Sequence, residues 1–129
     1  MSIQLNHTIV WVKDRDKSAH FLTEILGLPE AIPYGPFMVV EMSNHVSLDF
    51  CKTDKEITPQ HYAFLVTETE FDDIFKRICE LKMDYWADPG QTRLGQMNYN
   101  DGGRGLYFND PNGHLLEIIT KPYEAVEII

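Results

Sequence analysis

The sequence is poor in cysteine and in basic residues, and each scarcity excludes a class of protein. Only two of its 129 residues are cysteines, Cys51 and Cys79, and they form no Cys-x-x-Cys pair, so a disulfide scaffold or a cysteine-based zinc site has no support. The chain has 11 basic and 20 acidic residues, a formal charge of −9 that repels nucleic acid and anionic membranes. We therefore expect neither as a partner.

Long apolar runs are also missing. The longest, such as residues 62–66, have about five residues, whereas a helix that spans a bilayer needs roughly 20. Residues 1–5 lack the basic, apolar and small-residue zones of a secretory signal, so a cytoplasmic location is expected. Apolar residues still make up 43% of the chain, enough to bury a core, and a single domain over residues 1–129 is predicted.

The first half of the chain alternates strand-like and helix-like patterns. Residues 3–12 are rich in β-branched and aromatic side chains, which predicts a strand. Between Asp14 and Gly27, apolar residues follow a helical spacing, and glycine commonly ends a helix. Residues 37–42 and 46–51 predict two short strands after an irregular proline-rich approach.

The second half repeats this order. Residues 60–67 predict a strand, followed by a helix whose apolar residues recur at the helical period. A shift of 54 positions aligns His7 with His61, and a shift of 68 aligns residues 44–50 with residues 112–118. The 14 extra residues of the second copy form a longer loop.

This repetition predicts a duplicated βαβββ unit. The expected fold class is α+β, with module one at about residues 1–52 and module two at about residues 60–122. A repeat that occurs only twice favours a closed pair of modules over a solenoid.

Three ionisable residues lie on apolar strand faces, where a core is expected: His7, His61 and Glu117. A buried carboxylate without a partner is costly, and a cation bound by all three side chains removes that cost. Two imidazoles and one carboxylate form the facial triad associated with Fe(II), although Mn, Ni, Co or Zn can also fill it. His114 lies on the face opposite Glu117 and is expected to be structural.

Two further residues are candidates for catalysis. Asp49 is the repeat equivalent of Glu117, but its strand neighbours Ser47 and Cys51 are polar. It is therefore a fourth ligand, a base, an acceptor beside a ligand, or a solvated charge. Tyr107 stands opposite Glu117 if the chain forms a hairpin around residues 110–113, although packing at a sheet edge would also explain a tyrosine there.

The duplicated pattern, the two histidines and above all residues 105–119 (GLYFNDPNGHLLEII) resemble the vicinal oxygen chelate superfamily over nearly the whole chain. That superfamily includes glyoxalase I, extradiol dioxygenases, fosfomycin-resistance transferases and metal-free bleomycin-binding proteins. The resemblance implies curved sheets that form a cup, and a homodimer. It also implies His7, His61 and Glu117 as the ligand set.

Within the superfamily, residues 48–50, 60–66 and 98–108 are most similar to small iron-dependent ring-cleaving oxygenases of the chartreusin-biosynthesis type. The resemblance implies that the Tyr107 hydroxyl bonds a metal-bound substrate oxygen. A glyoxalase site would need a fourth ligand, and Asp49 is one methylene shorter than the usual Glu. The potassium-binding loop of the fosfomycin enzymes is not recognisable in this sequence.

Three functions remain as hypotheses. The first is an Fe(II)-dependent oxygenase that cleaves a catechol- or quinone-like small molecule. The second is lyase or isomerase chemistry at a redox-silent metal, with Asp49 as ligand or base. The third is a non-enzymatic dimer that sequesters a ligand in an aromatic cup lined by Trp11, Tyr34, Phe37, Trp86 and Tyr99.

Overall fold

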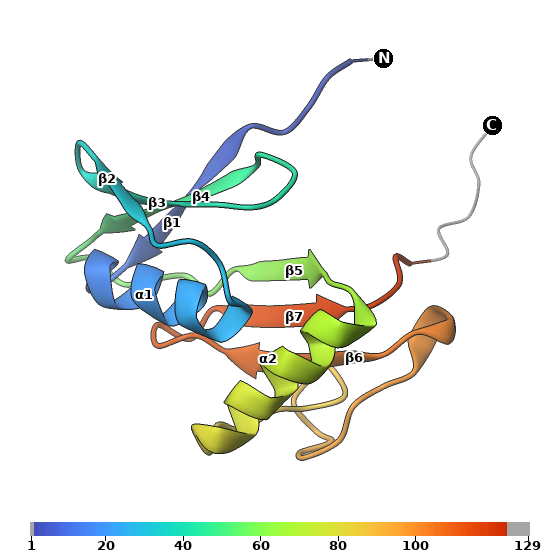
Figure 1. The fold of residues 1–129 in the computed structure, drawn as a ribbon. Helices are drawn as coiled ribbons and strands as arrows, with labels where there is room; N and C mark the ends of the chain where they lie inside the picture. The colour runs from blue at the N-terminus through green and yellow to red at the C-terminus, as the bar shows by residue number, and fades with distance from the viewer. Residues whose placement is uncertain (1, 124–129) are drawn as a thin grey trace. The chain divides into compact units, whose positions relative to one another are not determined.

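The chain divides into two compact units. A computed structural model describes residues 2–123 and is drawn in Figure 1. The first unit comprises Met1–Thr58 together with Asp110–Asn112, and the second comprises Pro59–Asn109 and Gly113–Ile129. Each unit contains one sheet and one α-helix, which confirms the predicted α+β class.

The first unit contains a four-stranded sheet in the order β1-β4-β3-β2. Its strands are β1 (His7–Val12), β2 (Ile32–Tyr34), β3 (Phe37–Glu41) and β4 (Ser47–Lys52). β1 runs parallel to β4, and the other pairs are antiparallel. Helix α1 (Arg15–Leu26) contacts β3 and β4, and one side of the sheet is buried with it.

Helix α1 begins and ends where the sequence predicts. The carboxylate of Asp14 accepts a hydrogen bond from the Lys17 backbone N–H at 3.1 Å, which satisfies one of the free donors of the first turn. Gly27 takes a left-handed conformation with φ of 70°, and its N–H bonds the carbonyl of Thr23. The start of α1 also contacts Asn112, which accepts from the Lys13 N–H and donates to the Ser18 hydroxyl.

The second unit contains a three-stranded sheet in the order β5-β7-β6. Its strands are β5 (His61–Leu65), β6 (Gly105–Asn109) and β7 (Leu115–Ile119), with β5 parallel and β6 antiparallel to β7. Helix α2 (Glu68–Glu80) starts with a capping box, and a 3₁₀ turn, η1, covers Asn100–Gly102. The buried apolar residues of this sheet and of α2 include Leu106, Phe108, Leu116, Ile118, Phe71, Ile74 and Ile78.

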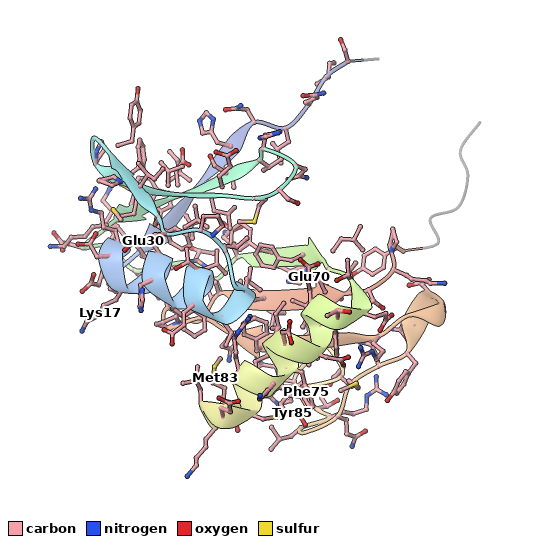
Figure 2. All side chains as sticks on the ribbon, in the orientation of Figure 1. Lys17, Glu30, Glu70, Phe75, Met83 and Tyr85 are labelled. Carbon is pink, nitrogen blue, oxygen red and sulfur yellow. The ribbon has the colours of Figure 1, made fainter. Side chains whose placement is uncertain are left out.

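The repeat is less regular than predicted in the second unit. Among the described residues, no strand precedes β6 after α2; Trp86 makes only isolated bridges to Leu94 and Tyr107. The Asp88 carboxylate accepts from the backbone N–H of Thr92 and of Arg93, and these bonds curl the chain into a loop. The segment is anchored to α2 by an edge-on contact of Phe75 and Tyr85 (Figure 2).

Two strand boundaries also differ from the prediction. The predicted strand at residues 3–12 starts only at His7, because its partner β4 begins at Ser47, directly opposite. Strand β2 was not predicted, because Pro33 lies at its centre. The strand can form because it lies at the edge of the sheet. On the side without a neighbouring strand, the backbone needs no N–H donor.

The structure shows no helix within residues 2–123 that is long and apolar enough to cross a bilayer. This agrees with the short apolar runs of the sequence.

Candidate functional site

The two units present their histidines and acids in the same register. In the first unit Asp49 pairs with Ile9, two residues after His7. In the second unit Glu117 pairs with Ala63, two residues after His61. Since alternate strand residues share a face, each histidine lies on the same side of its sheet as the matching acid.

These faces are not the core faces that the sequence predicted for the ionisable residues. His7 and His61 are exposed, and the buried apolar residues of β1 lie on the opposite face, at Val10 and Val12. Glu117 is the exception, because it is only 2% exposed. A helix therefore covers one side of each sheet, and the polar groups lie on the other side.

Glu117 lies at the centre of a group of polar side chains in the second unit. His61 Nε2 is 3.1 Å from Glu117 Oε1, and the Tyr123 hydroxyl is 3.2 Å from the same oxygen and 3.5 Å from Oε2. Tyr107 is the direct cross-strand partner of Glu117, which confirms the predicted hairpin pairing, and the charge of Glu117 acts on its hydroxyl. These four residues are called the Glu117 cluster below.

The orientation of His61 fits a metal-binding histidine. Its Nδ1 lies 3.0 Å from the carbonyl oxygen of Leu115, which can only accept, so Nδ1 carries a proton. In the neutral ring, Nε2 then presents a lone pair to Glu117 Oε1. Two acceptor atoms 3.1 Å apart need a cation that both can bind, either a second proton or a metal ion. The donor set and the backbone bond behind His61 thus suit a divalent metal.

The two tyrosines of the cluster have pKa values that burial and the charge of Glu117 raise. Burial raises the pKa of Tyr107 above its ordinary value, and the negative charge of Glu117 raises it further. Burial and Glu117 raise the pKa of Tyr123 in the same way. Both phenols therefore stay protonated at neutral pH, and Tyr123 donates to Glu117.

The first unit arranges its two candidate residues differently. His7 Nδ1 lies 2.7 Å from the side-chain oxygen of Asn6, and Asp49 accepts from the Ser47 hydroxyl at 2.8 Å. Asp49 is only 9% exposed, because Ile9 and Val39 flank it on the neighbouring strands. The polar neighbours of Asp49 on its own strand do not reveal this burial, because it comes from the two adjacent strands. Asp49 is thus not the solvated carboxylate that was one of its open alternatives.

The structure brings part of the predicted site together. His61, Glu117 and Tyr107 are in contact. Between residues 2 and 123, however, no three His, Cys, Asp or Glu side chains gather closely enough to hold a metal ion. His7 and Asp49 belong to the first unit and Glu117 to the second.

The sequence pattern did not indicate Tyr123. The residue follows β7, in a short segment with no strand or helix periodicity, so no pattern placed its side chain on Glu117. His114, in contrast, is structural as predicted. It is 1% exposed, and its Nδ1 accepts from the backbone N–H of Gln60.

The two units of sheet and helix agree with a comparison against known families. Residues 4–118 match the model of the Glyoxalase/Bleomycin resistance protein/Dioxygenase superfamily. The chain belongs to this superfamily. The resemblance seen in the sequence is therefore confirmed, together with the glyoxalase-like fold.

Two solved structures are highly similar to the chain. "Oxidase ChaP-H1" is 58% identical with a TM-score of 0.94, over 96% of this chain and 100% of that one. "Oxidase ChaP-H2" has the same identity and TM-score, over 97% and 98% of the two chains. Among curated proteins, "Glutathione transferase FosA" of Serratia marcescens is 29% identical over 88% of this chain and 78% of its own length.

The Glu117 cluster generates a prediction about tyrosine ionisation. Replacing Glu117 with Gln removes the negative charge that helps to raise the pKa of Tyr107 and Tyr123. Spectrophotometric titration of tyrosinate in metal-free protein should show ionisation at lower pH than in the wild type. The raised pKa stabilises the fold below about pH 10, the ordinary value, and this contribution disappears as the pH rises further. Glu80→Gln, at an exposed position of α2, is the control, and identical titrations of all three proteins would contradict the assignment.

Proposed function

We propose that this protein is an Fe(II)-dependent oxygenase that cleaves an aromatic, catechol- or quinone-like small molecule. The observation that carries the proposal is the His61–Glu117 pair, with Nε2 3.1 Å from Oε1 and Nδ1 fixed on the Leu115 carbonyl. His7, from the same chain or from a second copy, is the proposed third ligand. Mn, Ni, Co and Zn are the alternative metals for such a donor set.

The chemistry divides between the metal and the chain. Fe(II) held by His61, Glu117 and the proposed ligand His7 would supply Lewis-acid and redox chemistry toward the substrate oxygens and dioxygen. The Leu115 carbonyl keeps the His61 lone pair directed at the site, as a partner behind a metal-binding histidine does. Tyr107, protonated at neutral pH, can donate a hydrogen bond to a substrate oxygen, and Asp49 is the proposed base.

The similar proteins favour oxidation over group transfer. The two structures at 58% identity carry the name oxidase, whereas the curated transferase relative is 29% identical. Superfamily membership alone does not select a reaction, since one fold hosts many chemistries. The proposal of an oxidation therefore rests on the 58% identity to the two oxidases together with the donor set of His61 and Glu117.

A lyase or isomerase at a redox-silent metal is the second candidate. The buried position of Asp49 favours it, because a sheltered carboxylate at the repeat equivalent of Glu117 suits a fourth ligand. The short side chain argues against it, since a carboxylate must come within about 2.2 Å of the ion to bind. The Asp49 variant described below separates the two candidates.

The metal proposal predicts occupancy that depends on Glu117. Protein purified without chelators should contain close to one transition metal per chain by elemental analysis, and Glu117→Ala should lose it, because a buried ligand is removed. Glu24→Ala, on the exposed side of α1, is the charge-matched control and should keep the metal. Full occupancy in the Glu117→Ala protein would show that the ligand assignment is wrong.

The role of Asp49 is tested by an isosteric change. After anaerobic reconstitution with Fe(II), oxygen uptake on catechols and hydroxyquinones should fall on the order of 10²-fold in Asp49→Asn, as loss of a positioned base commonly causes. Metal occupancy should stay near the wild-type level, and Asp16→Asn, an exposed residue of α1, should change neither quantity.

Occupancy that falls as steeply as in Glu117→Ala would instead make Asp49 a ligand and favour the lyase or isomerase. Unchanged turnover on a substrate that the wild type accepts would remove Asp49 from the mechanism.

We also propose a homodimer. Large apolar side chains are exposed on the side of the first sheet that carries His7, among them Ile9, Trp11, Ile32 and Tyr34. Sedimentation at micromolar concentration should therefore give twice the chain mass, because apolar surface of this kind is stabilised by burial against a partner. Trp11→Glu should shift the distribution toward monomer. A wild-type monomer that still binds metal would exclude a site shared between two copies.

A further inference from the structure

Tyr123 differs from the other members of the Glu117 cluster in how it is held. Tyr107 lies within β6 and is 7% exposed, whereas Tyr123 follows β7, outside the sheet, and is 60% exposed. The Tyr123 hydroxyl is shared between Oε1 at 3.2 Å and Oε2 at 3.5 Å. Strong O–H···O bonds are about 2.7 Å long, so this contact is weak. The Tyr123 side chain can therefore turn away without disturbing a strand.

The Tyr123 hydroxyl also lies beside the oxygen that a metal ion would use. Oε1 faces His61 Nε2 and is the oxygen closer to Tyr123. A metal ion held by His61 and Glu117 would withdraw electron density from the carboxylate and place positive charge near the phenol hydrogen. Both effects weaken hydrogen-bond donation by Tyr123 to that oxygen. Without a metal, the same hydrogen bond helps to satisfy a carboxylate that is 2% exposed.

We propose that Tyr123 is an exchangeable cap on Glu117: its hydroxyl holds the carboxylate in the metal-free protein and leaves Oε1 when a metal ion binds. This inference rests on the proposed metal function. It assigns to Tyr123 a positioning role that depends on the metal, in contrast to Tyr107, which the strand pairing keeps opposite Glu117 in either state. The cap thus competes with the metal for one carboxylate oxygen.

The test compares Tyr123→Phe with the wild type, using Co²⁺ as the probe. Phenylalanine keeps the aromatic ring but removes the hydroxyl donor, so only the metal-free state loses a stabilising contact. Competition with a chromophoric chelator should show Co²⁺ bound about three- to tenfold more tightly by Tyr123→Phe, the range expected for one weak hydrogen bond. Thermal unfolding should show a lower Tm for the metal-free variant and a wild-type Tm once Co²⁺ is bound.

Tyr107→Phe is the matched control, because it removes the hydroxyl of the tyrosine that pairs directly with Glu117 across the strands. Its hydroxyl stays near Glu117 with or without metal, so its Tm should fall in both states and its Co²⁺ affinity should not increase. An equal gain of affinity in Tyr107→Phe would overturn the proposal, since any lost donor would then have the same effect.

The remaining outcomes are also decisive. Weaker Co²⁺ binding by Tyr123→Phe would mean that Tyr123 helps to hold the ion, and unchanged affinity would mean that it does not compete; either overturns the cap but leaves the metal site intact. A wild-type protein that binds no Co²⁺, Fe²⁺ or Mn²⁺ would overturn the proposed function and the cap together.

Discussion

The parallel pairing of β5 with β7 is the constraint on which the Glu117 cluster depends. The register puts Ala63 opposite Glu117 and leaves His61 two residues away on the same face, close enough for a 3.1 Å contact. A slip of one residue would turn the whole face over and move Glu117 into the apolar side under α2. The same pairing leaves the Leu115 carbonyl beside His61, so one strand supplies both the carboxylate and the group that orients the imidazole.

The two units show how one methylene group changes a repeated arrangement. The parallel pairing of β1 with β4 gives His7 and Asp49 the same register as His61 and Glu117. Glutamate reaches back to its histidine, whereas the shorter Asp49 is held by Ser47 on its own strand, and His7 bonds Asn6. The duplicated backbone is thus retained while the acids take different partners, which is consistent with different roles for the two carboxylates.

Much of the fold could be predicted from the sequence because local signals agreed with the tertiary structure. Asp14 and Gly27 bracket α1 as expected, and the turn at residues 110–113 joins the predicted hairpin. The predictions were wrong where long-range contacts decide. The start of β1 depends on where β4 begins, and β2 forms around a proline because it lies at an edge.

The same distinction applies to the candidate site. Strand patterns on both sides of the turn at residues 110–113 predicted that Tyr107 and Glu117 would pair, because both lie on regular strands of one hairpin. They could not predict the burial of Asp49, which depends on side chains from two neighbouring strands, or the position of Tyr123 after the last strand. Nor could they show that the histidines lie on exposed faces, since a pattern identifies the face of a strand but not which face a helix covers.

The contacts of Asn112 have a consequence for how the chain folds during synthesis. The compact unit that begins at the N-terminus includes Asp110–Asn112, and Asn112 bonds the backbone of Lys13 and the side chain of Ser18 across nearly the whole sequence. A nascent chain that has emerged from the ribosome only as far as β4 therefore lacks part of its first unit. Although the strands and helix of this unit are contiguous in the sequence, the unit is complete only after residues 110–112 have also been synthesised.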